Sequence, residues 1–172
     1  MMSARSSAKF SRRVGLSSPT RVAVALGSNL GDRHANLTLA RNHLARLLTN
    51  VQMSSAIETD PVDVPGVQPP FLNAAVVGDT TLSVHDLFRA LQDIEQAAGR
   101  QRPYPGAART LDLDLILFGN TILREPQLEL PHPRFRERRF VLVPLAEIAP
   151  DLRDPVTSLT VAELLARLPP ER

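Results

Sequence analysis

The segment from Leu111 to Phe118, LDLDLILF, constrains the fold more than any other part of the chain. Leucine recurs at alternate positions from 111 to 117, and this period of two is typical of a β-strand, whose successive side chains point to opposite faces. Asp112 and Asp114 share the other face with Ile116 and Phe118 and lie ~6.5 Å apart along the strand. We therefore expect a strand whose leucines pack against helices and whose two carboxylates face a different environment.

The segments around this strand follow a regular order. Alternation, helical spacing and clusters of proline and glycine distinguish strands, helices and loops. We predict a strand and turn over 21–32, strands over 51–59, 71–80 and 111–118, a short strand at 121–123, loops at 60–70 and 100–110, helices over 33–48, 83–99 (opened by a Ser83/Asp86 capping box) and 137–148 (interrupted at Pro144), and a last short helix opened by a Thr160/Glu163 capping box.

The order βαββαβ, followed by a C-terminal appendage, indicates an α+β fold of the ferredoxin-like kind. Such a fold has a mostly antiparallel sheet with helices packed on it. We expect the two crossover helices to cover one face of this sheet, which leaves the opposite face free for a site.

The net charge of +2 is unevenly distributed along the 172 residues. Residues 1–21 contain five basic side chains and no acid, which leaves a net charge of −3 for residues 22–172. Residues 1–20 are rich in serine and arginine and have too few apolar side chains to pack, so we expect a disordered basic leader, followed by a single domain over 21–172. The leader also resembles an organelle transit peptide in composition.

The residue types that the chain lacks exclude several chemistries. Without cysteine it has neither disulfides nor thiolate metal ligands, which fits a reducing, cytoplasmic setting. Lys9 is the only lysine, so the domain has no P-loop lysine, and any phosphate must be held by arginine, histidine, a metal ion or the backbone. No apolar run approaches the ~18 residues of a membrane span.

The two aspartates of the central strand are candidate metal ligands. Carboxylates this close repel one another unless a cation lies between them, and Mg²⁺ binds carboxylate oxygen while keeping water and phosphate oxygens as its other ligands. Arg109 precedes the strand, and Arg100 and Arg102 lie in the loop before it, where guanidinium groups suit phosphate oxygens. The alternative is a half-exposed strand with two solvated acids and surface arginines.

Other polar residues carry weaker signals. Pro131 and Pro133 fix the backbone around His132, which is either catalytic or structural. Asn73 beside Phe71 suits a flat, hydrogen-bonding heterocycle. The basic run at 134–140 is most simply the solvated start of a helix.

Five segments, in this order, resemble the 6-hydroxymethyl-7,8-dihydropterin pyrophosphokinase family. This family transfers the terminal pyrophosphate of ATP to the hydroxymethyl group of the pterin in folate biosynthesis and releases AMP, and its fold is α+β and ferredoxin-like. The matching segments are VALGSNLGDR (24–33), ETDPV with PPFLNAAV (within 58–76), IEQAAGRQR (94–102), RTLDLDLILFGN (109–120) and LPHPRFRERRFVLVPLAEIAP (130–150).

The resemblance implies a role for each matching position. Asp112 and Asp114 would hold two Mg²⁺ ions that bridge ATP, the co-substrate, and the pterin hydroxyl. The implied catalytic residues are Arg100, Arg109 and His132; the implied ATP contacts are Gln92, Glu95, Arg102, Leu115, His132 and Arg138; the implied pterin contacts are Thr59, Val62, Phe71, Asn73 and Phe140.

Two other classes of protein compete with this interpretation. RNA-recognition modules share the βαββαβ order, but they need exposed aromatic residues and a basic face, whereas this chain is 4% aromatic and its domain is slightly acidic. A second alternative is a degenerate family member kept as a scaffold. We expect instead a monofunctional, monomeric enzyme of small-molecule substrates, without nucleic-acid or membrane partners.

Overall fold

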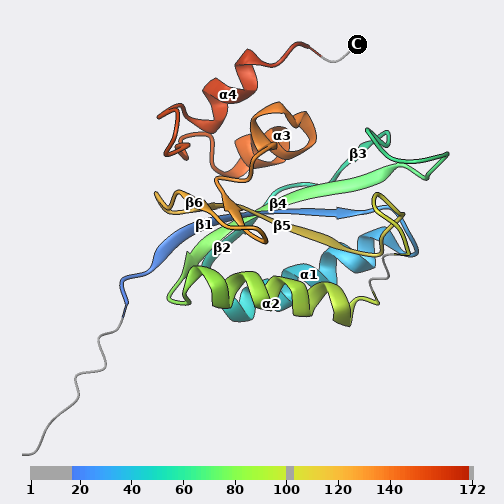
Figure 1. The fold of residues 1–172 in the computed structure, drawn as a ribbon, viewed down its shortest axis with the longest axis horizontal. Coiled ribbons are helices and arrows are strands. Elements are labelled where there is room, and N and C mark those ends of the chain that lie inside the picture. The colour runs from blue at the N-terminus through green and yellow to red at the C-terminus, as the bar shows by residue number, and fades with distance from the viewer. Residues whose placement is uncertain (1–16, 100–102, 171–172) are drawn as a thin grey trace, which may run out of the picture.

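The computed structural model describes residues 17–99 and 103–170. A central sheet lies between two layers of helices (Figure 1). Its elements are β1 (Thr20–Ser28), α1 (Arg33–Leu47), β2 (Thr49–Met53), β3 (Ile57–Thr59), β4 (Phe71–Thr80), α2 (Val84–Ala97), β5 (Asp112–Phe118), β6 (Leu123–Arg124), β7 (Glu129–Leu130), the 3₁₀-helix η1 (Phe135–Glu137), α3 (Arg139–Ile148) and α4 (Val161–Arg167).

The sheet has the order β2-β4-β1-β5, with β3 also paired to β4, and every pairing is antiparallel. The α+β, ferredoxin-like prediction is therefore confirmed. β1 begins at Thr20, one residue before the predicted start of the domain. Residues 1–16 lie outside the described part of the chain, so the disordered leader stays a prediction.

The helix starts follow the local sequence. Asp32 caps α1 by accepting a hydrogen bond from the Ala35 amide, and Ser83 caps α2 by accepting one from the Asp86 amide. The predicted capping box of Thr160 and Glu163 opens α4. Pro144 lies within α3 and does not interrupt it, which corrects the prediction.

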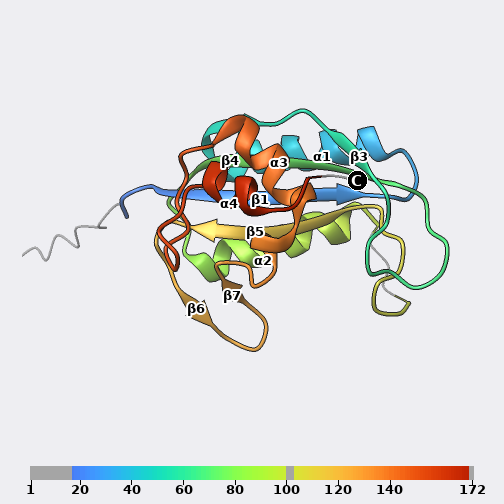
Figure 2. The same cartoon turned by 90° about the horizontal axis from the view of Figure 1, so that it is seen from above.

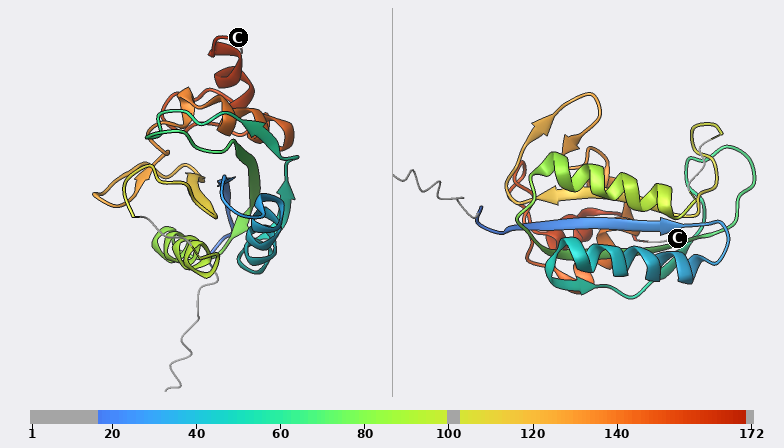
Figure 3. Two further views of the ribbon diagram at one scale, coloured as in Figure 1. Left: turned by 90° about the vertical axis from the view of Figure 1, so that its right-hand side faces the viewer. Right: turned by 90° about the horizontal axis from the view of Figure 1, so that it is seen from below.

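Helices cover both faces of the sheet, not one. Figure 3 shows α1 and α2 side by side along one face, and Figure 2 shows α3 and α4 above the other. The first layer buries leucines of both crossover helices, including Leu44 and Leu91, and the second buries Phe135, Leu142 and Leu164. Because α3 and α4 cover only part of their face, the remainder is left for a pocket.

The alternation of β5 reverses midway, which corrects the prediction for its C-terminal half. Leu111, Leu113 and Leu115 pack toward α1 and α2 as expected, but Leu117 packs toward α3 and α4 while Phe118 packs toward α1 and α2. The cause is an irregularity in the pairing with β1: Ala23 pairs with Leu117 and the next residue pairs with Leu115, so β5 has one extra residue. Asp112 and Asp114 precede the bulge and keep their predicted face.

The predicted strand 51–59 is two strands, β2 and β3. Ser54 separates them by replacing ladder contacts with its side chain: its Oγ accepts a hydrogen bond from the Ala75 amide and donates one to the Ser55 carbonyl. Glu147 of α3 accepts hydrogen bonds from the amide and hydroxyl of Ser55. The break therefore ties the sheet edge to the second helix layer.

Candidate active site

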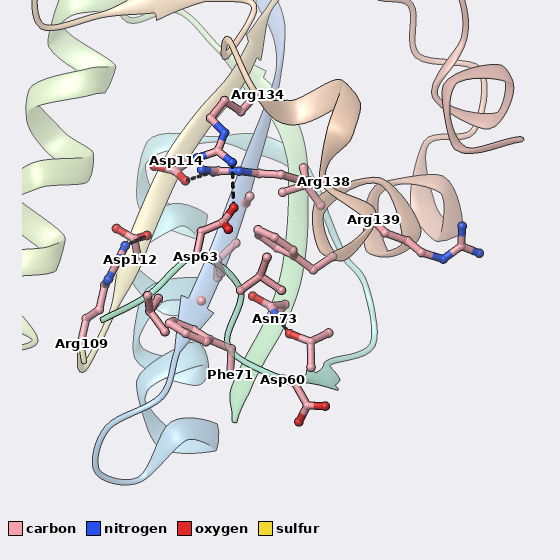
Figure 4. Close-up of a pocket in the computed structure, with 18 of the residues that line it drawn as sticks. Asp60, Asp63, Phe71, Asn73, Arg109, Asp112, Asp114, Arg134, Arg138 and Arg139 are labelled. Carbon is pink, nitrogen blue, oxygen red and sulfur yellow. Dashed lines mark hydrogen bonds and ion pairs between the residues drawn. The ribbon is translucent and has the colours of Figure 1, made fainter. Parts of the chain in front are cut away.

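A pocket of about 530 Å³ opens on the sheet face that α3 leaves uncovered. Figure 4 shows side chains from the strands, from the 60–70 loop and from the start of α3 converging on it. Ala25 and Gly27 of β1 line it, and small side chains at these positions leave space above the sheet. The site therefore lies on the face that the carboxylates of β5 were predicted to occupy.

Asp112 and Asp114 lie opposite Gly27 and Ala25 in the sheet and line the pocket from β5. Their side chains are 16% and 34% exposed, so solvent reaches both carboxylates. Arg109 Nη1 lies 2.5 Å from Asp112 Oδ2, and Arg138 Nη1 lies 3.7 Å from Asp114 Oδ2. Each acid thus faces an arginine from a different segment.

Asn29, which the sequence analysis did not select, holds the backbone of Arg109. Its side-chain Oδ1 accepts a hydrogen bond from the Arg109 backbone amide, and its backbone amide donates one to the Arg109 carbonyl. Its Nδ2 donates to Gln68 Oε1 and to the Pro69 carbonyl, while Gln68 donates to the Gly106 carbonyl. The turn after β1, the 60–70 loop and the segment before β5 therefore share one hydrogen-bond network.

His132 stands beside the pocket wall and is neutral. Its amide donates to the Ile116 carbonyl, and its Nδ1 accepts a hydrogen bond from the Arg134 amide. Burial, helped by the positive charge of Arg138, lowers the pKa of His132 to about 4. The proton of the neutral ring is therefore on Nε2, which lies 3.9 Å from Asp114 Oδ2, too far for a hydrogen bond.

One end of the pocket is apolar, and we call it the aromatic slot. Phe71 and Phe140 line it together with Thr59, Val62 and Asn73, so the structure brings these five predicted residues together. Asn73 is 5% exposed and donates a 2.7 Å hydrogen bond from Nδ2 to Thr59 Oγ1, which fixes the orientation of its amide. Two aromatic rings and a buried amide suit a planar heterocycle with a polar edge.

Three of the implied ATP contacts lie away from the pocket. Gln92 is exposed on α2, and Leu115 is buried under α1 and α2. Glu95 is buried and accepts a 2.7 Å hydrogen bond from the Leu113 amide, between the two aspartates. Arg100 and Arg102 lie outside the described residues.

Five charged residues line the pocket without having been predicted to do so: Asp60, Asp63, Arg134, Glu137 and Arg139. Arg134 Nη2 lies 3.1 Å from Asp63 Oδ2, so the 60–70 loop contacts the segment before α3 (Figure 4). The run RFRERRF (134–140) is therefore not simply the solvated start of a helix. Its position two residues after His132 was the available signal that it borders the pocket.

A carboxylate pair flanked by arginines, next to an aromatic slot on a ferredoxin-like sheet, defines an enzyme that acts on a phosphate substrate and a flat heterocycle. Comparison with known proteins agrees. The family model for 7,8-dihydro-6-hydroxymethylpterin-pyrophosphokinase matches residues 23–150. The chain belongs to this family.

Individual proteins that resemble the chain carry related names. The 2-amino-4-hydroxy-6-hydroxymethyldihydropteridine pyrophosphokinase of Pseudomonas aeruginosa is 44% identical over 151 residues, which cover 87% of this chain and 92% of the relative. That of Bacillus subtilis is 43% identical over 137 residues, or 78% of this chain and 81% of the relative. A crystal structure of Plasmodium falciparum HPPK-DHPS shares the fold, with a TM-score of 0.69 at 12% identity over 90% of this chain and 46% of that one.

Within residues 17–99 and 103–170, no helix is long and apolar enough to cross a membrane.

Proposed function

We propose that this pocket is where the chain carries out the reaction of its family, the transfer of pyrophosphate from ATP to 6-hydroxymethyl-7,8-dihydropterin in folate biosynthesis. One observation carries the proposal: the carboxylates of Asp112 and Asp114 lie in the same pocket as Phe71, Phe140 and Asn73. In the reaction, the hydroxymethyl group loses its proton and a bond forms between its oxygen and the β-phosphorus, while the bond from that phosphorus to the oxygen of AMP breaks. AMP is the leaving group.

The apolar end of the pocket is the proposed pterin site. Phe71 and Phe140 would flank the ring, and the amide of Asn73, oriented by Thr59, would pair with its polar edge. Val62 is 62% exposed on the 60–70 loop and would add apolar contact when the pterin is bound. A buried amide that loses its partner costs free energy, so the site would favour heterocycles that satisfy it.

Asp112 and Asp114 are the proposed ligands of two Mg²⁺ ions. Among the described residues, no group of three or more His, Cys, Asp and Glu could hold a metal by itself. Mg²⁺ nevertheless suits two carboxylates, because it takes most of its other ligands from water and substrate phosphates. Bound Mg²⁺ would supply charge neutralisation on the polyphosphate and lower the proton affinity of the pterin hydroxyl.

The arginines are the proposed phosphate ligands. Arg109 and Arg138 already face the carboxylates, and a planar guanidinium can move from carboxylate to phosphate oxygen with little change in geometry. His132 would donate from Nε2 to a phosphate oxygen as a neutral group. Gln92, Glu95, Leu115, Arg100 and Arg102 remain proposed contacts of the nucleotide or of the transfer step, by family resemblance.

The wider setting is also proposed. The enzyme would act as a monomer in the cytoplasm, on small molecules and not on nucleic acid. The net charge of −3 over residues 22–172 supports the last point, because a polyanion is bound mainly by basic surfaces.

Binding of the pterin by calorimetry tests the proposed site. Asn73→Leu, which keeps the size of the side chain and removes its amide, should weaken pterin binding about 10- to 100-fold, as expected for one buried hydrogen-bonding group. Asn42→Leu, on the exposed side of α1, is the matched control and should leave binding unchanged. Equal affinity in wild type and Asn73→Leu would contradict the assignment of the slot.

A further inference from the structure

The pocket is linked to the C-terminal segment through Arg136 and Asp154, which line no part of it. Arg136 Nε lies 2.6 Å from Asp154 Oδ2 and its Nη2 lies 2.9 Å from Asp154 Oδ1, a bidentate pair. The side chain of Asp154 is completely buried, and that of Arg136 is 28% exposed. The guanidinium also lies over the ring of Phe135, 5.0 Å from its centroid.

Asp154 is saturated with hydrogen bonds from its own loop. Its Oδ1 accepts a hydrogen bond from the Val156 amide, and its Oδ2 accepts one from Thr157 Oγ1. Its backbone also bonds with Leu159 and Ser158. The carboxylate is therefore held in place by its own loop, independently of Arg136, and it can serve as a fixed anchor for the guanidinium.

The segment that Arg136 holds is short and carries the arginines of the pocket. η1 is a three-residue 3₁₀-helix, and neither it nor α3 has a side-chain cap at its N-terminus. Arg134 precedes η1 and Arg138 follows it, and both line the pocket. A 3₁₀ turn has poor hydrogen-bond geometry, so its conformation depends on contacts from outside.

We infer that Arg136 and Asp154 are positioning residues, which set the place of Arg138 and Arg134 for the triphosphate of the nucleotide. The inference rests on the nucleotide role proposed for Arg138. Arg136 reaches Asp154 and not the pocket, and this contact holds the turn around which Arg134, Glu137 and Arg138 line the pocket. The segment after α3 thereby contributes to the nucleotide side of the site without contacting a substrate.

The positioning role predicts an effect confined to one substrate. The pterin slot is built from β3, β4 and the 60–70 loop as well as Phe140, whereas the nucleotide side depends on η1. Loss of the anchor should therefore raise the KM for ATP and lower kcat, while the KM for the pterin changes little. A purely structural pair would lower the thermal stability and leave both KM values of the folded enzyme alone.

Steady-state kinetics of the full chain test this inference. Arg136→Gln should raise the KM for ATP by about tenfold or more, since small displacements of a positioning group cost up to ~100-fold in rate. Thr160→Ala is the matched control, because it removes the N-cap hydrogen bond of α4 in the same C-terminal segment without removing a bond to the Asp154 carboxylate or to η1; it should lower Tm and leave the KM for ATP within about twofold. Arg136→Lys keeps the charge and loses the bidentate geometry, so its KM for ATP should lie between those of the wild type and Arg136→Gln. If Arg136→Gln is unfolded at the assay temperature, Arg136→Lys replaces it in the test.

The outcomes are distinct. If Arg138→Gln raises the KM for ATP and the Arg136 variant does not, the positioning role is wrong and the nucleotide role of Arg138 stands. If Arg138→Gln leaves the KM for ATP unchanged, the nucleotide role is wrong, and the positioning role is wrong with it. If Thr160→Ala changes the KM for ATP as much as Arg136→Gln, the effect is one of general stability and the inference is contradicted.

Discussion

Arg109 Nη1 lies 2.5 Å from Asp112 Oδ2, and Arg109 is three residues before Asp112, the first residue of β5. The pair is partly buried, with 22% and 16% of the two side chains exposed, and the Arg109 guanidinium is also 6.0 Å from the centroid of Phe71. Arg109 therefore stands between the carboxylates and the aromatic slot. This is where the developing charge of a transferred phosphoryl group would lie.

Arg109→Ala should lower kcat by about 10²- to 10³-fold, the usual cost of removing one charge-stabilising donor from a site. Stability should change little, because the backbone of this residue is held by Asn29 and not by its own side chain. Stopped-flow measurement of AMP formation would check the rate. Arg124→Ala, an exposed arginine of β6, is the control, and a kcat for Arg109→Ala within twofold of its value would contradict the role.

Gly27→Ala should weaken pterin binding and leave the KM for ATP unchanged. A Cβ on Gly27 would lie 3.3 Å from Asn73 Oδ1 and 3.8 Å from the ring of Phe71, so it would fill the floor of the slot and crowd its amide. We expect the KM for the pterin to rise about tenfold, the cost of roughly 1.4 kcal/mol of lost contact. An unchanged KM for the pterin in the folded variant would show that the heterocycle lies elsewhere.

Much of this fold follows from local patterns, because capping residues, proline clusters and periodicity act over a few residues. The predicted order of elements and the shared face of Asp112 and Asp114 are of this kind. The exchange of Leu117 and Phe118 was not predictable in this way, since both residues are apolar and a bulge moves either of them to the other face without changing the pattern.

The residues of the site also differ in whether local sequence could predict them. Residues that chemistry marks in the sequence, such as Asp112 and Arg109, were predicted, and they line the pocket. Asn29 and Asp63 were missed, because their partners are at least 39 residues away along the chain and only tertiary structure brings them together. Arg136 and Asp154 belong to the same group, because they are 18 positions apart along the chain.

Glu95 provides a test of how β5 is held. Its Oε1 accepts a 2.7 Å hydrogen bond from the Leu113 amide. This amide lies between the two aspartates, on the outer side of β5, which is an edge strand of the sheet. Glu95→Ala should cost about 1–3 kcal/mol of unfolding free energy by leaving this amide unsatisfied, and turnover should fall because both carboxylates shift. Glu95→Gln keeps the acceptor and should retain most of the stability, as urea unfolding would measure. Equal destabilisation by Ala and Gln would mean that the charge, and not the hydrogen bond, holds the strand.

Asp154 makes part of the stability dependent on pH. Burial opposes its ionisation, but hydrogen bonds from Arg136, Thr157 and Val156 outweigh burial and lower the pKa of Asp154 below 3.8. A lowered pKa in the folded state means that the stabilisation is present above the unfolded pKa and is lost as pH falls through the folded pKa. Asp154→Asn should therefore lower the free energy of unfolding by roughly 3 kcal/mol at neutral pH.

This difference in stability between wild type and Asp154→Asn should shrink in acid, below about pH 4. Urea unfolding of both proteins at a series of pH values measures it. A difference that stays constant from neutral pH to about pH 3 would contradict the anchoring role of the ionised carboxylate.

The most direct measurement is AMP release from ATP in the presence of 6-hydroxymethyl-7,8-dihydropterin, followed with Mg²⁺ and with EDTA, for wild type, Asp112→Asn and Asp114→Asn. Each change removes a charge from the proposed metal site and keeps the size of the side chain, so circular dichroism should show an intact fold. We predict one AMP for each pterin diphosphate in the wild type with Mg²⁺, none with EDTA, and none above background in either variant. AMP release at wild-type rates in EDTA, or in either asparagine variant, would contradict the account.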